Sequence, residues 1–169
     1  RAHILAHFLD DSPSPNFPFL CLTVSGGHTQ IVRVDSPSEM EVIGTTLDDA
    51  AGEAFDKVAK LIGLPYPGGP LIDKYSKLGD CKRFIFNKSN VFKLNLSFSG
   101  FKTQVLRFLQ KNLQENPDFF IDANKQNLYD FCASVQHTII SMLMDKLVLA
   151  VQQTRIDEIA IAGGVSANS

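Results

Sequence analysis

Residues 48–73 read DDAAGEAFDKVAKLIGLPYPGGPLID, and this stretch decides which fold the rest of the chain can adopt. The spacing of its apolar residues predicts a helix that begins in the acidic residues after position 48 and ends near Gly63. A Pro/Gly turn at residues 66–70 follows, and a second helix is predicted from Gly69 to Leu78.

The first predicted helix has one acidic face and one apolar face. Asp49, Glu53 and Asp56 are four and three residues apart, so a helix places them on adjacent turns of one side. The opposite stripe consists of Phe55, Val58, Ala59 and Ile62. Two interpretations stay open. The acidic face is simply solvated, or it contacts a ligand that the backbone of the glycine-rich turn can also approach closely, because glycine has no side chain.

Composition indicates one globular domain or a large part of one. The 169 residues carry a formal charge of −2, and 44% of them are hydrophobic, which argues against a stand-alone nucleic-acid binder. No apolar run approaches the roughly 20 residues of a membrane span and no signal peptide opens the sequence, so we expect a cytoplasmic protein with no membrane partner. Three scattered cysteines without CxxC spacing predict reduced, packed thiols.

Ahead of the opening stretch, three short strands are predicted: residues 19–24, 29–34 and 40–46. The first two are joined by Ser25-Gly26-Gly27-His28. This connection is either a type I′ or II′ hairpin turn, or a nest in which the hydroxyls of Ser25 and Thr29 flank free amides able to hold phosphate oxygens. Three antiparallel strands followed by helices resemble one lobe of the actin, hexokinase and Hsp70 class of ATP-binding folds.

Residues 80–96 are predicted to be irregular and place lysines among Phe84, Phe86 and Phe92. Such a segment either stacks on and neutralises nucleic acid or is a solvated loop anchored by its aromatic rings. Ser97 or Ser99 is the expected N-cap of the helix that follows. The apolar stripe expected on that helix is Val105, Leu106, Leu109 and Leu113.

The last third of the sequence predicts a core helix, a strand and a glycine-rich turn. Apolar residues three and four apart extend over residues 125–153, and residues 158–162 read as a buried strand. The turn GGVSAN at residues 163–168 is of the kind that supports a purine or ribose, because glycines admit flat rings and Asn168 can form hydrogen bonds with them.

Four motifs together resemble one family: VSGGHTQ at 24–30, the block at 48–70, SFSGFKT at 97–103 and AGGVSAN at 162–168. The sequence resembles the TsaD family, the tRNA threonylcarbamoyladenosine synthases once catalogued as O-sialoglycoprotein endopeptidases. The resemblance implies an α/β, actin-like ATPase fold (ASKHA, ribonuclease H-like) that is incomplete here. It also implies transfer of a threonylcarbamoyl group from threonylcarbamoyl-AMP to N6 of the adenosine beside the anticodon of tRNAs that read ANN codons.

Because the sequence starts at Arg1 without Met and stops in a loop, we expect residues 1–169 to be a central fragment of such a protein. In this division, residues 1–18 are the start of the metal-motif helix and a linker. Residues 19–155 supply the strands and a helical insert. Residues 156–169 supply a strand and the start of the nucleotide-binding loop of the other lobe.

The resemblance assigns substrate-binding positions but no catalytic residue. The loop that binds the phosphate and acyl part of the adenylate matches Thr23, Val24, Ser25, Gly26 and Gly27. Asp56, Gly69 and Asp73 match the positions that bind the ribose and the intermediate, and Asn168 matches the asparagine beside the nucleotide.

His3 and His7 lie at helical i, i+4 spacing, which suits either a divalent metal or a surface or capping role. By resemblance, His3 matches the second histidine of the HxxxH metal motif of the family, and His7 matches no ligand. The other two ligands of the family lie outside residues 1–169. We therefore expect the parent protein to use one divalent metal, Fe(II) or Zn(II), that this fragment does not hold, and the fragment alone to be inactive.

The implied partners are tRNA, threonylcarbamoyl-AMP, and the paralogous scaffold and ATPase proteins of the same pathway. Two rival functions are weighed against the transferase. A metalloendopeptidase would need an acid/base glutamate beside its histidines, and His3-Ile4-Leu5-Ala6-His7 has none. A non-catalytic nucleotide-binding scaffold of the same fold stays open.

Overall fold

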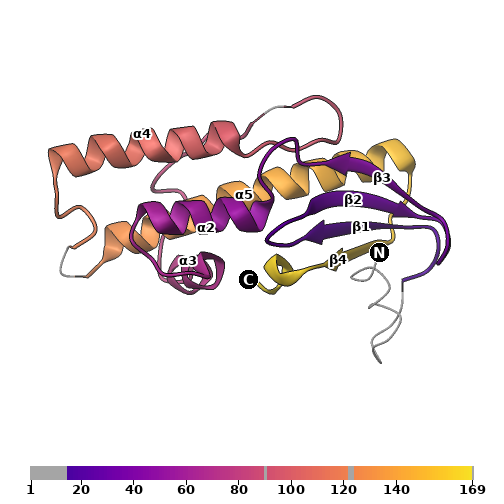
Figure 1. Cartoon of the computed structure of the whole chain (residues 1–169), viewed down its shortest axis with the longest axis horizontal. Coiled ribbons are helices and arrows are strands. Elements are labelled where there is room, and N and C mark those ends of the chain that lie inside the picture. The colour runs from indigo at the N-terminus through magenta and orange to yellow at the C-terminus, as the bar shows by residue number, and fades with distance from the viewer. Residues whose placement is uncertain (1–14, 90, 122–123, 169) are drawn as a thin grey trace.

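The computed structural model describes residues 15–89, 91–121 and 124–168, which form a four-stranded sheet flanked by helices (Figure 1). The sheet order is β3-β2-β1-β4. Its strands are β1 (Phe19–Val24), β2 (Thr29–Val34), β3 (Met40–Thr45) and β4 (Ile159–Ala162). The first three pair antiparallel, and β4 pairs parallel with β1. The strand β1 is therefore interior, which explains its nearly continuous apolar sequence.

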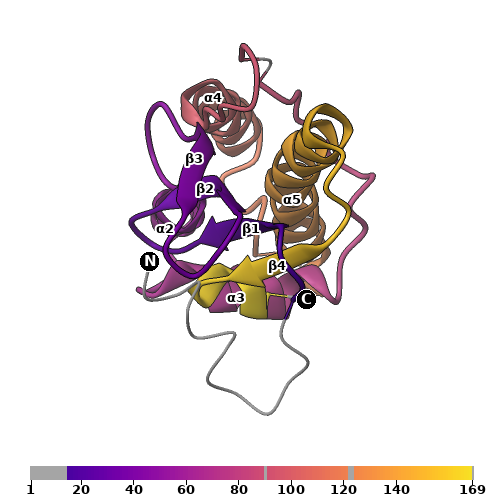
Figure 2. The same cartoon turned by 90° about the vertical axis from the view of Figure 1, so that its right-hand side faces the viewer.

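The helices are α2 (Ala51–Leu61), α3 (Gly68–Ser76), α4 (Ser99–Glu115) and α5 (Gln126–Thr154), and a 3₁₀ turn η2 (Gly164–Ala167) follows β4. In Figure 1, α5 runs along most of the molecule and reaches from α3 to the sheet, and Figure 2 shows the same helix nearly end-on. The helix α2 lies at the end of the sheet where the β1–β2 turn and η2 are found.

Two buried clusters lie on the two faces of the sheet. One face of β1 contributes Leu20, Leu22 and Val24 to the main core, which also contains the apolar faces of α2 and α5. The other face contributes Phe19 and Cys21 to a smaller cluster. The alternation of residues between the two clusters follows the period of two of a β-strand.

An aromatic cluster fixes residues 80–96 to α4 and α5. Phe84 lies 4.9 Å from Phe108, Phe86 lies 5.7 Å from Phe101, and Phe108 stacks on Phe131 at 5.7 Å, measured between ring centroids. The interpretation as a loop anchored by aromatic rings is confirmed for Phe84 and Phe86. The third ring of the predicted set, Phe92, is 80% exposed.

The elements predicted after residue 18 are present, with local differences, whereas the metal-motif helix expected within residues 1–18 falls mainly outside the described residues. The α3 helix ends at Ser76, two residues before the predicted end. The stripe predicted on α4 is only half right, because Val105 and Leu109 are buried whereas Leu106 is exposed. The strand predicted as buried, β4, is exposed on one face, where Ile159 and Ile161 are 43% and 44% exposed.

The expected N-cap of α4 is wrong. The residue before the helix is Phe98, and no serine side chain caps it. Instead the Asp48 carboxylate accepts hydrogen bonds from Ser97 Oγ at 2.5 Å, Phe98 N at 2.8 Å and Ser99 N at 3.4 Å. The helix is thus capped from a loop 50 residues away.

By length and composition, α5 could span a membrane, and it is the one helix of the described residues for which this holds. Half of its most apolar window is buried inside the structure. It packs along α3 and against the aromatic cluster, and it carries the buried polar residues Asp130, Ser134 and Gln136. This is the pattern of a core helix.

Candidate functional site

A cavity of about 230 Å³ lies where three glycine-rich segments meet. Its lining comes from the β1–β2 turn, α2, the turn into α3, and η2 with the residue after it. The lining residues are Gly26, Gly52, Phe55, Asp56, Tyr66, Pro67, Gly69, Pro70, Gly164, Val165 and Asn168. The segments are far apart in sequence, so the cavity is a product of the tertiary fold.

The parallel pairing of β1 with β4 brings the first and last of these segments together. In the register, Thr23 lies opposite Ala162, so the two strands end side by side. Gly163 has a φ of 105°, and a Cβ there would lie 2.3 Å from the carbonyl oxygen of Val24. Only glycine fits this left-handed, close approach. The carboxyl ends of adjacent parallel strands are a common place for ligand sites in α/β sheets.

The β1–β2 turn rests on the first turn of α2. The hydroxyl of Thr29 accepts a hydrogen bond from Ala51 N at 2.8 Å, and the carbonyl oxygen of Ser25 accepts one from Gly52 N at 3.3 Å. A Cβ on Gly52 would lie 2.7 Å from Ser25 O and 2.8 Å from Gly26 Cα. The absence of a side chain at Gly52 therefore allows the turn to approach the helix.

Both interpretations of this turn need correction. Ser25 and His28 close a tight hairpin connection, since Ser25 N donates to His28 O at 2.8 Å, but neither Gly26 nor Gly27 has the positive φ of a type I′ or II′ turn. The hydroxyls predicted to hold phosphate also form bonds within the protein. Ser25 Oγ donates to His28 O and accepts from His28 N, and Thr29 Oγ1 accepts from Ala51 N at the start of α2. Among the described residues, the amides of Gly26 and Gly27 have no acceptor, so the backbone half of the nest prediction is retained.

Asp56 joins α2 to the beginning of α3. Its Oδ1 accepts a hydrogen bond from Gly68 N at 2.7 Å, which satisfies one of the open amides at that helix end. No acceptor for the next amide, that of Gly69, is present in the described part of the chain, and Pro70 has none to donate. Asp56 Oδ2 has no partner among the described residues, so a carboxylate oxygen and a backbone amide are both available at the cavity.

Asn168 approaches the cavity from the other side and is connected to Asp73 through Gln136. Asn168 Nδ2 lies 3.2 Å from Gln136 Oε1, and Gln136 Nε2 lies 3.0 Å from Asp73 Oδ1. Asp73 also pairs with Lys77 at 3.0 Å. Asp73 is only 9% exposed and is not part of the cavity lining.

The acidic face of α2 is paired with lysines. Lys57 Nζ lies 2.7 Å from both Asp49 Oδ1 and Glu53 Oε1, and Lys102 of α4 also pairs with Asp49. Burial acts to raise the pKa of the Asp49 carboxyl, but the two ammonium groups outweigh it and the pKa is lowered. The face is thus neither simply solvated nor wholly free for a ligand, and only Asp56 of the three acidic residues lines the cavity between the glycine-rich segments.

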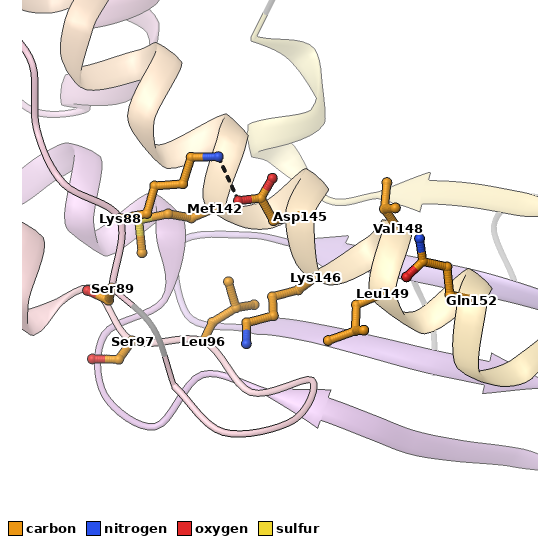
Figure 3. A pocket seen from close by; sticks show the side chains of 10 residues that line it. All are labelled: Lys88, Ser89, Leu96, Ser97, Met142, Asp145, Lys146, Val148, Leu149 and Gln152. Atoms are coloured by element: carbon orange, nitrogen blue, oxygen red, sulfur yellow. Dashed lines mark hydrogen bonds and ion pairs between the residues drawn. The ribbon is translucent and has the colours of Figure 1, made fainter.

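A larger cavity of about 510 Å³ lies between α5 and residues 88–97 (Figure 3). Its charged groups bind within the protein: Lys88 Nζ lies 2.6 Å from Asp145 Oδ2, and Lys146 Nζ donates to two loop carbonyl oxygens at 2.7 Å. Of the sequence motifs it includes only Ser97, whose hydroxyl is bonded to Asp48. These contacts are those of a structural junction.

The structure brings together four of the nine described residues that the sequence assigned to substrate: Gly26, Asp56, Gly69 and Asn168. The other five border or support the cavity without lining it: Thr23, Val24, Ser25, Gly27 and Asp73. Residues missed at the sequence level are Gly52, Tyr66 and Gln136. Tyr66, in the same turn as Gly69, could have been found as an apolar residue between two prolines, whereas nothing local marks Gln136.

The implied metal cannot be assigned to the described residues. Within residues 15–89, 91–121 and 124–168, no group of three or more His, Cys, Asp or Glu side chains could hold a metal ion. His3, the residue matched to a metal ligand, lies outside the described residues. The acidic side chains near the cavity do not fit the metal either, since they bind lysines or the Gly68 amide. No step of the chemistry is therefore routed through a metal here.

Comparison with known proteins agrees with the arrangement of motifs. The family model for TsaD, tRNA N6-adenosine threonylcarbamoyltransferase, matches residues 1–169. Proteins of that name from Christiangramia forsetii, Cytophaga hutchinsonii and Riemerella anatipestifer are 61%, 58% and 57% identical to the chain over its whole length. The chain spans about half the length of these curated relatives, 48–49%. It belongs to the TsaD family, whose fold is the actin-like α/β fold.

Proposed function

We propose that this chain is the central part of a tRNA N6-adenosine threonylcarbamoyltransferase. The reaction transfers a threonylcarbamoyl group from threonylcarbamoyl-AMP to N6 of the adenosine beside the anticodon of tRNAs that read ANN codons. The observation that carries the proposal is the meeting of three motif segments, with Gly26, Asp56, Gly69 and Asn168, around one cavity. These are the segments by which the chain resembles its family.

The groups around the cavity suit a nucleotide with an activated acyl group. The open amides of Gly26, Gly27 and Gly69 can donate hydrogen bonds to phosphate or acyl oxygens, and the last of them lies at the N-terminus of α3. Asp56 Oδ2 can accept a hydrogen bond from a ribose hydroxyl. We assign the phosphate and acyl part to the β1–β2 turn, including Thr23, Val24 and Ser25, and the ribose to Asp56 and Gly69. Asp73 acts from behind the cavity.

The chemistry is acyl transfer without a covalent enzyme intermediate. The N6 nitrogen attacks the carbamoyl carbon, the bond from that carbon to the phosphate oxygen breaks, and AMP leaves with the bonding electron pair while N6 loses a proton. The lone pair of N6 is delocalised into the adenine ring, so N6 is a weak nucleophile. Fixed orientation of both substrates and amide donors aimed at the developing negative charge are the contributions that this chain can make.

An exposed aromatic ring beside the cavity supports a second substrate that contains a nucleobase. Tyr66 is 85% exposed and also lines an adjoining cavity of about 230 Å³ together with Lys57, Lys60 and the carboxylates of Glu53 and Asp56. Lys57 is paired with Asp49 and Glu53, so Lys60 is the lysine of this cavity that has no ion pair among the described residues. Exposed aromatic rings next to lysines are typical of sites for unpaired RNA, where bases stack and phosphates are neutralised. This supports tRNA as the acceptor.

The remaining assignments rest on family membership. We infer that the parent enzyme uses one divalent metal, Fe(II) or Zn(II), with His3 among its ligands, and that this metal supplies Lewis acidity when bound. We infer that the enzyme works in the cytoplasm with a paralogous scaffold and an ATPase. Within it, residues 1–18 belong to the metal-motif helix and a linker, residues 19–155 to the strands and helical insert, and residues 156–169 to the start of the second lobe.

The test is incorporation of labelled threonine into tRNA by the full-length protein, supplied with ATP, bicarbonate, the adenylate-forming enzyme and its partner proteins. Asp56→Asn keeps an oxygen for the Gly68 amide but loses the charge, so we expect transfer to fall by a factor of about 100 with little change in melting temperature. Asp145→Asn, in the larger cavity, is the matched control and should retain transfer.

Two results would contradict this proposal. Full transfer by Asp56→Asn would remove the assignment of Asp56. A folded wild-type protein that binds AMP but never transfers threonine would favour the non-catalytic scaffold.

A further inference from the structure

Gln136 connects two elements of the site although it does not line the cavity. It lies on α5 and is 5% exposed. Its Nε2 donates to Asp73 Oδ1 and to Ser76 Oγ, each at 3.0 Å, and its Oε1 accepts from Asn168 Nδ2 at 3.2 Å. One buried amide therefore joins α3 to the segment after η2.

The orientation of this amide is determined by the chemistry of Asp73. A carboxylate paired with Lys77 can only accept hydrogen bonds, so the NH₂ group of Gln136 must face it. The oxygen of Gln136 therefore faces Asn168, and the NH₂ group of Asn168 must donate the hydrogen bond to it. The oxygen and nitrogen of a side-chain amide are usually hard to tell apart. Here the charged Asp73 carboxylate fixes the direction of both hydrogen bonds, from Gln136 to Asp73 and from Asn168 to Gln136.

The consequence falls on the remaining atom of Asn168. With Nδ2 turned towards Gln136, and also 3.5 Å from the carbonyl oxygen of Gly69, Oδ1 is the atom left for a ligand in the cavity that Asn168 lines. An oxygen there accepts a hydrogen bond from a donor, such as a ribose hydroxyl or the exocyclic amine of adenine.

We propose that Gln136 is a positioning residue that holds the Asn168 amide with Oδ1 available as the acceptor for a donor group of the bound adenosine. The inference rests on the proposed function, because it takes an adenosine nucleotide as the ligand. Gln136 acts through Asn168 and does not touch the substrate.

The experiment is a double-mutant cycle on the full-length protein, with AMP as the probe and calorimetry as the measurement of affinity. Gln136→Met keeps the length of the side chain but has no amide, and we expect AMP affinity to fall about tenfold, the usual effect of one lost hydrogen bond to a ligand. In the Asn168→Ala background the same change should have no further effect on AMP affinity. Equal losses in the two backgrounds, or wild-type affinity of Gln136→Met, would overturn the proposal.

Ser76→Ala is the matched control, because it removes another partner of Gln136 and leaves the connection from Asp73 to Asn168. It should bind AMP as the wild type does. If Gln136→Met does not fold, Gln136→Asn retains a buried amide that is one methylene too short to join both partners, and it should show the same tenfold loss.

Three AMP analogues identify the donor: inosine monophosphate, 2′-deoxy-AMP and 3′-deoxy-AMP. The first lacks the exocyclic amine and the other two each lack one hydroxyl, so the coupling between Gln136 and Asn168 should vanish with the analogue whose missing group is the donor. Coupling that persists with all three analogues would overturn the role of Oδ1.

The readouts separate this inference from the proposed function. A wild-type protein that binds AMP without transferring threonine would contradict the proposed function, but the double-mutant cycle on AMP affinity would still test the role of Gln136. A wild-type protein with no affinity for AMP overturns the inference, whatever its transferase activity.

Discussion

At the scale of single residues, Gly52 determines how closely the β1–β2 turn approaches α2. A Cβ at this position would lie 2.7–2.9 Å from Ser25 O, Gly26 Cα and Gly26 N, all of them backbone atoms that cannot rotate away. Gly27 in the same turn has no atom within 4 Å of a built Cβ. The two neighbouring glycines therefore differ in what a side chain would cost.

We expect Gly52→Ala to destabilise the protein by about 1–3 kcal/mol, because the turn must move away from the helix. Gly27→Ala should change the free energy of unfolding by less than about 0.5 kcal/mol. Urea unfolding of both variants measures the difference, and AMP affinity should fall only for Gly52→Ala. Equal stability of the two variants would show that the approach is not as close as described.

The contribution of Asp48 to the free energy of unfolding depends on pH. Burial acts to raise the pKa of this carboxyl, but hydrogen bonds from Ser97, Phe98 and Ser99 outweigh it, so the pKa is lowered from its usual 3.8. A carboxyl whose pKa is lower in the folded state stabilises the fold above its unfolded pKa, and this stabilisation is lost as the pH falls through the folded value.

Asp48→Ala should therefore cost about 1–2 kcal/mol at pH 7, the range of a lost helix cap. The difference from wild type should shrink as the pH falls below about 3.8. Unfolding free energies measured from pH 7 to pH 2.5 check both statements, and a difference that stays constant over that range would contradict the role of the charge.

At the scale of elements, periodicity predicted α2 and α5 to within about three residues at their ends, because each has one continuous apolar face that must be buried. The contacts that join elements could not be read in this way. Asp48 caps α4 and Asp56 caps α3 across 50 and 12 residues of sequence. Local pattern favoured a serine cap for α4 because it contains no information about which distant carboxylate the fold brings close.

The same limit applies to the candidate site. Gly26, Asp56, Gly69 and Asn168 were identified through motifs, and all four line one cavity. Gln136 was not identified, because in the sequence it is one polar residue within a helix pattern and its partners Asp73 and Asn168 lie 63 and 32 residues away.

Two adjacent residues of α5, one buried and one exposed, allow a direct comparison of how alanine substitution changes stability. Leu147 is 1% exposed in the core, and its neighbour Val148 is 50% exposed. We expect Leu147→Ala to destabilise the protein by about 2–5 kcal/mol, because it removes buried methyl groups and leaves a cavity, and Val148→Ala by less than about 1 kcal/mol. Chemical unfolding of the two variants decides whether this side of α5 faces the core, and the reverse order would refute it.

At the scale of the whole molecule, the three cysteines report on the integrity of the fold. Burial raises the pKa of Cys21 to about 11 and that of Cys132 to about 12, whereas Cys81 is partly exposed. Since the thiolate is the reactive form, the two buried thiols are protected twice, by exclusion of the reagent and by their protonation.

We expect iodoacetamide at pH 8 to alkylate Cys81 in the native protein and to reach Cys21 and Cys132 only after unfolding. Mass spectrometry of the resulting peptides assigns each site. Modification of all three cysteines at one common rate under native conditions would show that the two clusters on the faces of the sheet are open to solvent.

The strand order has a consequence for the time at which the site comes into existence. During synthesis, β1 and β2 can pair as soon as they leave the ribosome, but the other edge of β1 has to wait for β4, about 140 residues later in the chain. Until then an apolar strand presents unpaired backbone groups, which favours contact with chaperones or other nascent chains. The cavity between the glycine-rich segments is consequently complete only after β4 and η2 have been synthesised, and translation must pass Asn168 before the protein can hold a nucleotide there.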